Sequence, residues 1–599
     1  MFQTFEVVAS PLQGAARLAA LRAVLASDGL AGFIVPRADA HQGEYVSPCD
    51  ERLQWLTGFT GSAGFCVVLP DVAGVYIDGR YRTQVKLQVD LAVFTPVAWP
   101  DVLPGPWIAE HLADGVVGYD PWLHTAEEIG KIEAALAGRV VLRPCRNMVD
   151  AIWPDQPGPA MGLAFVHDDA VAGETAAAKR ARLAEGLRAA GQRAAVLTLP
   201  DSICWLLNIR GADVPRNPVV QAFAVLGADG TVDLFAESAK FGDAVLAHMG
   251  PEVRLHPVAE FMPHLRAMTG PVRLDRCTAP ILLSQEMAAA GVAVVWGDDP
   301  CKLPKAVKNA GEIAGMRVAH LRDGAAMVEF LAWLDLRLPQ GGLTEIDVVV
   351  ALEGFRRATN ALHDISFDTI SGAGPNGAIM HYRVTEDSNR QIGTDTLLLV
   401  DSGAQYLDGT TDITRTVAVG DPGQEARDCF TRVLQGMIAI SRARWPMGMA
   451  GRDLDGLARY NLWLAGQDFN HGTGHGVGAF LSVHEGPQRL SRLSEVPLEP
   501  GMILSNEPGY YREGAFGIRI ENLIVVQRAP TLPGGDDREQ VSFETLTFVP
   551  LDRRLIVVEA LSPGERSWIN AYHAEVSLRL RGRLSDFALA WMDRACQPL

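Results

Sequence analysis

Between residues 401 and 521, four carboxylates and one imidazole stand at the ends of apolar runs or among glycines, which restricts how the chain can fold. Asp401 ends LLLVD, Asp412 lies in TTDITRT, and Glu507 follows GMILSN. His475 lies in HGTGHGVG, and Glu521 is expected inside the apolar strand GIRIENLIVV. A buried ionised carboxylate is costly unless a cation or hydrogen-bond donors compensate it. The fold must therefore gather these groups around cations or leave them in turns.

Taken singly, these residues have ordinary interpretations. Asp-Ser-Gly is typical of a capped turn, and a histidine among glycines is typical of a solvated loop. However, Asp401 and Asp412 are expected on two consecutive strands joined by a turn at Asp408-Gly409, so that a hairpin brings them together. With His475 and the two glutamates they form an oxygen-rich ligand set that suits two divalent ions about 3.5 Å apart. Manganese, cobalt and zinc fit such a set better than magnesium, because it includes an imidazole.

Three further histidines are candidates for contact with a substrate. They are His381 in GAIMHYR, His471 in NHGTGHG and His484 in LSVHEGP. An imidazole beside a reacting carbonyl stabilises the oxyanion or transfers a proton. A core or loop histidine with a satisfied hydrogen bond is the alternative, and it stays open for each of them at this point.

Length and charge limit the possible classes of protein. The chain has 599 residues, for which two to four domains are expected. Its net charge is -18, and it has no run of Lys or Arg that would form a basic patch. Both features argue against a nucleic-acid partner. Eight scattered cysteines without a CxxC pair favour a reducing compartment. We find no secretion signal and no apolar stretch that approaches a membrane span, so we expect a cytoplasmic protein with no membrane partner.

An internal repeat sets the expected domain organisation. The segment ARLAALRAVLASDGLAGFIVP, followed later by LQWLTGFTG, resembles KRARLAEGLRAAGQRAAVLTLPDSICWLLNIRG. Each copy has a helix, a glycine, an apolar strand that ends in Pro, and a Trp-Leu pair before a glycine turn. The Pro/Gly-rich segment 154–162 is a candidate linker between them. We therefore expect two repeated α/β domains, at 1–155 and 156–305.

The remaining residues, 306–599, predict a mixed α+β domain. Helical periodicity runs through 311–339, 344–360, 424–445 and 452–467, with Thr344 as the cap of the second helix. The runs around Asp401, Asp412, Glu507 and Glu521 are expected as strands. A C-terminal extension from about 542 is expected to add an extended piece and one helix.

Taken together, the motifs identify a family. They are VDSGAQYLDGTTDITRT, HGTGHGVG, VHEGP, NEPGYY and GIRIEN, with HQGEYVSPCDERLQWLTGFTGSAGF and YIDGRY nearer the N-terminus. Their combination resembles the pita-bread metallopeptidases, and most of all the three-domain type of aminopeptidase P, over nearly the whole chain. The resemblance implies two creatinase-like α/β domains followed by a pita-bread catalytic domain. It also implies a cytosolic homodimer.

The resemblance further implies hydrolysis of the N-terminal Xaa-Pro bond of peptides, at two metal ions with a bridging hydroxide. By motif, Asp401 and Asp412 resemble ligands of one ion, with Asp412 bridging to the other. His475 and Glu507 resemble the ligands that complete the second set, and Glu521 bridges. Manganese is the first expectation, with zinc or cobalt as alternatives.

Further roles follow from the same resemblance. Glu507 resembles the general base, and His381, His471 and His484 resemble substrate-side histidines. Arg519 resembles an arginine that supports the ligands, and the alternative is a simple charge partner of Glu521.

Two alternative functions remain at this stage. A prolidase would cleave only Xaa-Pro dipeptides, and a catalytically inactive binding protein on the same fold would lack ligand residues. The presence of all five ligand residues disfavours the second alternative.

Overall fold

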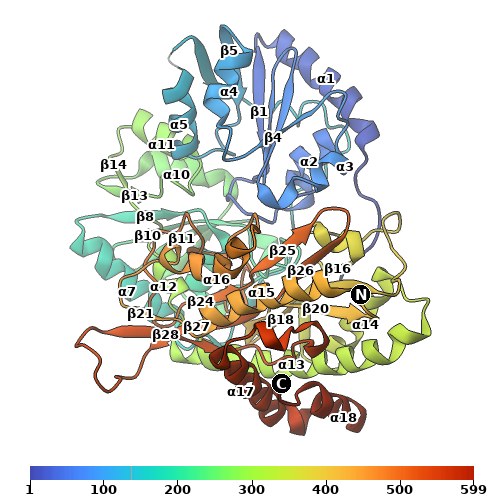
Figure 1. Ribbon diagram of the computed structural model, residues 1–599. Coiled ribbons are helices and arrows are strands. Elements are labelled where there is room, and N and C mark those ends of the chain that lie inside the picture. Colours follow the sequence, from blue (N-terminus) through green and yellow to red (C-terminus); the bar gives the residue numbers. More distant parts are fainter. Residues whose placement is uncertain (137) are drawn as a thin grey trace. The chain divides into compact units, whose positions relative to one another are not determined.

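The computed structural model describes residues 1–136 and 138–599, and it divides into two compact units (Figure 1). Unit 2 comprises residues 8–302. Unit 1 comprises Met1–Val7 together with Leu303–Leu599. The chain therefore begins in unit 1, forms the whole of unit 2, and returns to unit 1.

Each half of unit 2 contains one six-stranded sheet with helices. The first half contains β1 (Gly32–Pro36), β2 (Phe65–Val68), β3 (Ala73–Ile77), β4 (Thr95–Ala98), β5 (Gly115–Tyr119), β6 (Val140–Pro144), α1 (Gly14–Ser27), α2 (Arg52–Thr57), α3 (Gln84–Gln88), α4 (Pro104–His111) and α5 (Ala126–Leu136). The second contains β7 (Phe165–Val166), β8 (Ala194–Leu197), β9 (Ile209–Arg210), β10 (Phe223–Gly227), β11 (Val232–Phe235), β12 (Val253–His256), β13 (Val272–Leu274), β14 (Val294–Trp296), α6 (Asp169–Ala172), α7 (Ala176–Ala189), α8 (Pro200–Leu207), α9 (Asp243–Met249), α10 (Phe261–Ala267) and α11 (Ile281–Ala289).

The two sheets have the same topology, which confirms the predicted repeat. The strand orders are β4-β3-β2-β1-β5-β6 and β12-β11-β10-β8-β13-β14. In the first sheet β1 pairs antiparallel with β2 and parallel with β5, and in the second sheet β8 pairs antiparallel with β10 and parallel with β13. The predicted helix–strand–helix segments correspond to α1-β1-α2 and α7-β8-α8. Leu18, Leu21 and Leu25 form the buried stripe of α1, as the spacing of three and four predicts.

Unit 1 is a mixed α+β unit with the site-bearing strands at its centre. α12 (Lys302–Ala306) lies where the chain enters it. Its other helices are α13 (Ala310–Arg337), α14 (Glu345–Arg357), α15 (Gln424–Ser441), α16 (Arg452–Leu464), α17 (Pro563–Leu580) and α18 (Asp586–Ala595). Its strands are β15 (Leu362–Ile365), β16 (Ile370–Ala373), β17 (Thr396–Ser402), β18 (Ala404–Tyr406), β19 (Gly409–Thr410), β20 (Ile413–Val419), β21 (Arg444–Pro446), β22 (Gly474–Gly476), β23 (Glu485–Leu490), β24 (Ile503–Asn506), β25 (Gly509–Arg512), β26 (Phe516–Arg519), β27 (Asn522–Arg528) and β28 (Gln540–Thr545).

Two sheets of unit 1 matter for the site. One has the order β16-β17-β20 and the other β21-β28-β27-β24-β22-β23. A hydrogen bond connects β20 to the residue directly before β27, because Glu521 N–H donates to the Thr414 carbonyl (3.2 Å). A second one connects β20 to β26 of the separate two-stranded sheet β25-β26, because Thr416 Oγ1 donates to the Arg519 carbonyl (2.9 Å). The ends of β17, β20, β24 and β27 thus belong to one hydrogen-bonded framework.

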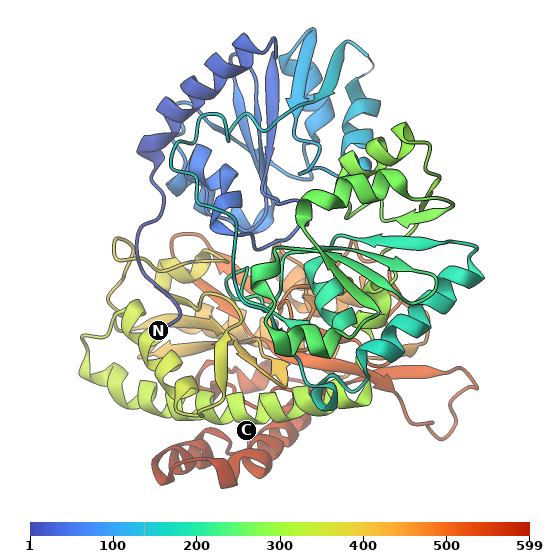
Figure 2. The same cartoon turned by 180° about the vertical axis from the view of Figure 1, so that it is seen from behind.

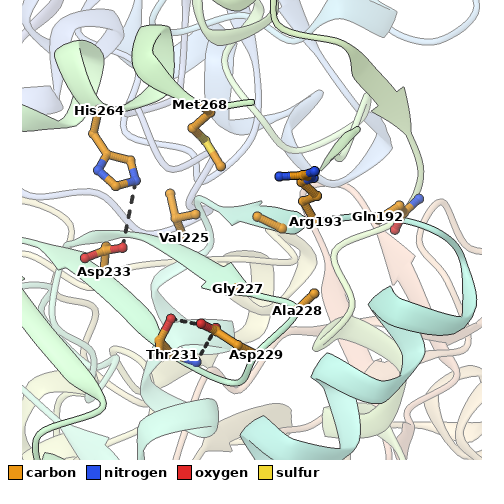
Figure 3. Close-up of a pocket in the computed structure, with 11 residues that line it drawn as sticks. Gln192, Arg193, Val225, Gly227, Ala228, Asp229, Thr231, Asp233, His264 and Met268 are labelled. Carbon is orange, nitrogen blue, oxygen red and sulfur yellow. Dashed lines mark hydrogen bonds and ion pairs between the residues drawn. The ribbon is translucent and has the colours of Figure 1, made fainter. Parts of the chain in front are cut away.

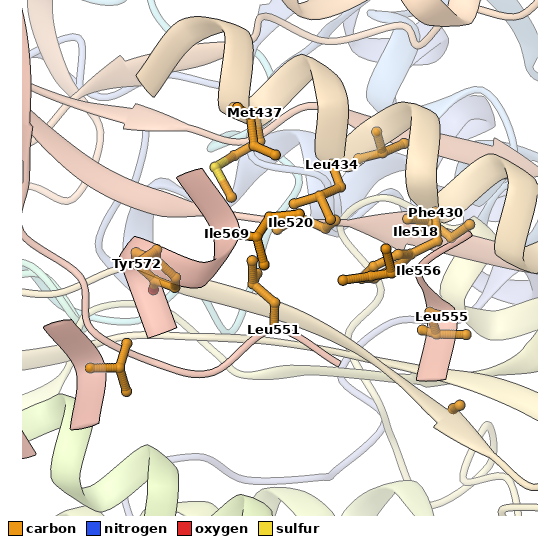
Figure 4. Packing of buried hydrophobic residues seen from close by; sticks show 14 of the residues in the cluster. Phe430, Leu434, Met437, Ile518, Ile520, Leu551, Leu555, Ile556, Ile569 and Tyr572 are labelled. Atoms are coloured by element: carbon orange, nitrogen blue, oxygen red, sulfur yellow. The ribbon is translucent and has the colours of Figure 1, made fainter. Parts of the chain in front are cut away.

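Helices bury both faces of the three-stranded sheet. Alternate residues of a strand face opposite sides, so Leu398 and Val400 join the core with α13 and α14, and Leu397 joins the core with α15 and α17. Figure 4 shows this second core, where Leu434 of α15 and Ile569 of α17 pack around the residues next to the site strands. The long helix α13 lies beside α17 and α18 in both views (Figures 1 and 2).

Three local predictions differ from the structure. The helical run predicted over 424–445 ends at Ser441, because Trp445 instead pairs with Val541 in β21 and β28. Glu521 lies in a two-residue break between β26 and β27 rather than inside one strand. The C-terminal extension has two helices, α17 and α18, where one was predicted.

Candidate metal centre

The two aspartates meet at one end of an antiparallel strand pair. β17 pairs with β20 so that Asp401 lies opposite Thr414 and Ser402 opposite Ile413, and Asp412 directly precedes β20. The predicted pairing of two strands is confirmed. The connection between them is more elaborate than one turn, because β18 and β19 form a second hairpin in another sheet, with Asp408 at its tip.

The other three predicted ligands come from the six-stranded sheet and its edges. His475 lies on β22, Glu507 follows β24, and Glu521 precedes β27. Ligand atoms of Asp412, His475 and Glu521 all lie within 4.8 Å of one another. The Nε2 atom of His475 is 3.5 Å from Asp412 Oδ2 and 3.5 Å from Glu507 Oε1. Four of the five predicted ligands therefore face a common point.

The orientation of His475 suits a metal ligand. Its Nδ1 atom is 2.9 Å from the carbonyl oxygen of Gly476, which leaves Nε2 directed at the carboxylates. An Nδ1–H that donates to a backbone carbonyl fixes the tautomer whose Nε2 carries the lone pair. The Ser505 hydroxyl accepts the His475 N–H (2.9 Å) and donates to Glu507 Oε1 (3.2 Å). The local backbone thus holds the imidazole and the carboxylate of Glu507 together.

Asp401 is the fifth predicted ligand, and its charge acts on Asp412. Its Oδ2 accepts a hydrogen bond from Arg519 (2.6 Å), whereas its buried Oδ1 has no hydrogen-bond partner among the described residues. A buried carboxylate oxygen without a donor costs about 1–3 kcal/mol, and more when it is charged. A cation beside Oδ1 would remove that cost, so the residues present fit a metal ion.

Crowded carboxylates make this site electrostatically unusual. Burial, together with the charges of Asp401 and Glu507, raises the pKa of Asp412 well above its ordinary value. Burial and the charge of Asp412 do the same to the pKa of Glu521. Burial also raises the pKa of Glu507, against the attraction of His475. Divalent cations are the ordinary compensation for such a group of acids.

The three candidate histidines lie at the same place. The rings of His475 and His484 have centroids 4.3 Å apart, and those of His484 and His381 have centroids 6.5 Å apart and are stacked. His471 Nδ1 is 3.9 Å from Glu507 Oε2. The structure thus brings together every residue that the sequence motifs singled out for the site.

Arg519 contacts Asp401 rather than Glu521, so it is not the simple partner of Glu521 considered above. Its guanidinium also donates to the Tyr511 hydroxyl (2.7 Å), which lies 2.9 Å from His471 Nε2. Burial raises the pKa of Tyr511 to about 12. In the sequence, Tyr511 stands out only as part of the motif NEPGYY. Its partners come from elsewhere in the chain, so the local pattern gave no sign of them.

Thr414 is a second residue that sequence reasoning missed. Its hydroxyl donates to Glu521 Oε2 (2.8 Å) and accepts from Arg519 Nε (3.3 Å). The only signal was its place two residues after Asp412, where a strand alternates back to the same face.

A separate hollow of about 360 Å³ lies in unit 2 (Figure 3). Polar side chains such as Asp229, Asp233 and His264 line it. None of the predicted site residues is among its lining residues, and we assign it no part in the metal centre.

Comparisons with known proteins place this site in a class. Residues 314–528 match the family model of metallopeptidase family M24, and 539–599 match the C-terminal region of that peptidase family. Residues 17–152 and 155–312 each match the creatinase/prolidase N-terminal domain. The fold and the clustered acids are thus those of a metallopeptidase with two creatinase-type N-terminal domains.

Relatives along the whole chain narrow the class. A probable Xaa-Pro aminopeptidase P of Aspergillus fumigatus is 38% identical, over 97% of this chain and 92% of the relative. Aminopeptidase P2 of Arabidopsis thaliana is 40% identical, over 92% and 83% respectively. The crystal structure of X-prolyl aminopeptidase from Caenorhabditis elegans, described as a cytosolic enzyme with a di-nuclear active site, superimposes with a TM-score of 0.94 at 33% identity, over 98% of this chain and 100% of that one.

The chain belongs to the Xaa-Pro aminopeptidase P family of M24 metallopeptidases. It is an enzyme of the metal-dependent aminopeptidase type. Among the residues that the structure describes, no helix is long and apolar enough to cross a membrane.

Proposed function

We propose that this enzyme removes the N-terminal residue from peptides whose second residue is proline. The clustering of Asp412, His475 and Glu521 within 4.8 Å, in a chain related to aminopeptidases P over nearly its full length, carries the proposal. The Xaa-Pro bond is a tertiary amide without an N–H, and proline fixes its local geometry. A site that acts on the carbonyl and holds the proline ring does not need the missing N–H.

We propose that the site holds two divalent ions, manganese first and zinc or cobalt as alternatives. One ion would be held by Asp401 and Asp412 and the other by His475 and Glu507, with Asp412 and Glu521 shared between them. When bound, such a pair supplies a bridging hydroxide as the nucleophile and polarises the scissile carbonyl. Two findings support this assignment: the C. elegans enzyme is described as di-nuclear, and the buried Asp401 Oδ1 has no hydrogen-bond partner in the described part of the chain.

The chain's own residues carry the remaining steps. Glu507 acts as the general base, and burial raises its pKa above the ordinary value of a carboxyl group, which makes it a better proton acceptor. His484 and His381 form a stack that begins beside the ligand His475, so they are placed to contact the carbonyl oxygen of a bound peptide. His471 contacts substrate from the side of Tyr511.

Arg519 has a supporting role in this proposal. It neutralises Asp401 and braces Tyr511, and it also takes part in binding substrate.

Turnover on a defined peptide panel tests the proposal. Metal-free protein is given Mn, Co or Zn and then Xaa-Pro dipeptides, the tripeptide Arg-Pro-Pro, and a matched Arg-Ala-Pro peptide. We expect release of free arginine from Arg-Pro-Pro and none from Arg-Ala-Pro. Cleavage confined to dipeptides would favour a prolidase instead.

A catalytically inactive binding protein, the other alternative at the level of the sequence, is disfavoured by the relatives, which are named as aminopeptidases. Metal content checks this separately, because a binding protein does not need a metal-loaded centre. Fewer than about one ion per chain after mild purification, not restored by added Mn, would favour it, since a two-metal site needs both ions.

We also propose a homodimer. Leu457, Tyr460, Trp463 and Leu464 of α16 and the nearby Leu493 form an exposed apolar surface, the α16 patch, with Leu464 70% and Leu493 79% exposed. Such a patch on a folded chain is typical of an interface. Leu464→Glu should convert a dimer to a monomer in light scattering, whereas Leu532→Glu, at an exposed site outside the patch, should not. A wild-type monomer would contradict the proposal.

Two further proposals concern location and domain limits. A cytoplasmic location is supported by the description of the C. elegans enzyme as cytosolic, and cell fractionation tests it.

We propose domain limits of 1–155, 156–305 and 306–599, with an extension from about 542. Limited proteolysis should cut near residue 155, where the chain is mostly exposed, and should spare residue 542, which lies inside the paired strand β28. Residues 1–7 are the exception to these limits, because they pack with unit 1.

A further inference from the structure

Residues 2–6, here called the arm, precede unit 2 in the chain but pack on unit 1 (Figure 2). Gln3 is only 2% exposed. Its Oε1 accepts the backbone N–H of Thr369 (2.8 Å), and its Nε2 donates to the carbonyl of the same residue (3.2 Å). The carboxylate of Glu353 accepts the N–H of Phe2 (2.9 Å). The arm therefore satisfies both backbone groups of the residue that directly precedes β16.

The arm also contacts the segment that follows His381. Arg383 donates to the carbonyl of Thr4 (3.0 Å), and the N–H of Glu386 donates to the carbonyl of Phe5 (2.8 Å). Phe5 packs against the cluster that includes Tyr382 and Val384. In both bonds the acceptor is a main-chain carbonyl of the arm, and the donor is a backbone N–H or the Arg383 guanidinium. These bonds therefore do not depend on the arm's side chains.

His381 lies between anchored neighbours. The carbonyl of Met380 accepts a hydrogen bond from Arg519 (3.3 Å), and the Tyr382 hydroxyl donates to Glu345 (2.8 Å). The arm adds the third anchor at residues 383–386. A histidine that projects from a segment without regular structure has its ring placed by such flanking contacts.

We propose that the arm is a positioning segment for His381, so that the first residues of the chain help to build the substrate side of the metal centre. This inference rests on the proposed role of His381 in substrate contact. It predicts that loss of the arm impairs turnover while the metal ligands, which lie on or next to β17, β20, β22, β24 and β27, keep their metal.

The test uses the full chain, a variant that lacks residues 2–6, and Gln3→Ala. Gln192→Ala, which removes a comparably buried glutamine from unit 2, is the matched control. We measure kcat and KM on Arg-Pro-Pro, metal content, and hydrogen exchange of the amides in 366–386. We expect kcat to fall by about 10-fold to 100-fold with the arm deleted, because a misplacement of about 1 Å costs this order of rate. The metal content of the arm variants should equal that of the wild type. The control Gln192→Ala should equal the wild type in every measurement.

Rescue separates positioning from a general loss of structure. A synthetic peptide with the sequence MFQTFEVV should restore both kcat and slow exchange to the deletion variant. Wild-type kcat in both variants would overturn the inference, as would faster exchange in 366–386 without a change in kcat. If the wild type fails to cleave Arg-Pro-Pro, the proposed function fails. In that case, unchanged exchange on deletion of the arm would overturn the inference separately.

Discussion

At the scale of single residues, the metal centre is a set of acids that lack enough positive charge of their own. Asp401, Asp412, Glu507 and Glu521 gather around one imidazole, and Arg519 is the cation paired with Asp401. Burial, together with the charges of the neighbouring acids, raises the pKa of Asp412 and of Glu521. Their individual roles can be separated by substitutions that remove one charge at a time.

Glu507→Gln and Asp412→Ala should differ in kind. Glu507→Gln is expected to retain at least one ion and to lose about 10²–10⁴-fold in kcat, because a general base contributes this much. Asp412→Ala should lose both metal and activity, since this carboxylate serves both proposed ions, yet keep its fold. Elemental analysis and kinetics check both, with the exposed Glu513→Gln as the control. Retained turnover in Asp412→Ala would contradict the ligand assignment.

The pH dependence of the metal-free protein follows from the raised pKa values of Asp412, Glu507 and Glu521. These folded carboxyls hold protons that the unfolded chain releases near about pH 4. Because the folded state then binds more protons, the free energy of unfolding falls as pH rises through the folded pKa values. Added Mn must displace those protons, so its stabilising effect should grow as pH rises above about 4, the ordinary pKa of these carboxyls in the unfolded chain.

Thermal unfolding of the metal-free protein, with and without Mn, measures this effect. Burial lowers the pKa of His573 to about 3 and that of His167 to about 2, so these residues instead add stability as pH rises toward about 6.5. Comparison with Asp412→Asn cancels their contribution, because both histidines are unchanged in it. If the melting temperature changes with pH in the same way in the two metal-free proteins, Asp412 does not hold a proton.

At the scale of elements, helices α13 and α14 hold the loop between the two aspartates. Asp323 of α13 and Arg356 of α14 form a buried bidentate pair at 2.8 and 2.9 Å. Asp323 also accepts from Tyr406 (2.8 Å) and Thr411 (2.9 Å), and Arg356 donates to the carbonyl of Ser402 (3.4 Å). One buried ion pair thus fixes the residues directly after Asp401 and directly before Asp412.

Asp323→Asn should therefore weaken both the fold and metal binding. Breaking one side of a buried pair costs about 3–5 kcal/mol, because the remaining charge is left uncompensated. We expect a loss of this size in urea unfolding and a higher apparent Kd for Mn. Glu544→Gln, which breaks the exposed pair with Arg317, should cost less than about 1 kcal/mol. An Mn affinity equal to wild type would show that the helices do not shape the ligand loop.

At the scale of the whole chain, both chain ends contribute to unit 1. The arm reaches the segment around His381, and α17 places Tyr572 against the strands of the site. The hydroxyl of Tyr572 accepts from Arg415 (3.0 Å) and from the N–H of Val549 (3.1 Å), and the carbonyl of Glu521 accepts from the same Arg415. The C-terminal region is therefore connected to a ligand residue through one arginine.

Tyr572→Phe is expected to lower the free energy of unfolding by about 1–3 kcal/mol, because it leaves buried partners unsatisfied. Metal content should stay that of the wild type, since the ligands keep their positions. Truncation before α17 should instead give insoluble protein, because Ile569, Val576 and Leu580 then leave the α15 core open. Urea unfolding and elemental analysis check the point variant. A soluble, active truncation would contradict this account.

The sequence by itself determined the local features: apolar strands with a carboxylate at their ends, the repeat in unit 2, and the capped helix at Thr344. These follow from periodicity and turn chemistry within short windows, so the sequence predicted the repeated sheets and the pairing of β17 with β20. Only the tertiary structure decided that Arg519 pairs with Asp401, that Tyr511 braces His471, and that residues 2–6 pack on unit 1. Such partners lie tens to hundreds of residues apart, and which donor meets which buried acid depends on packing that no local pattern encodes.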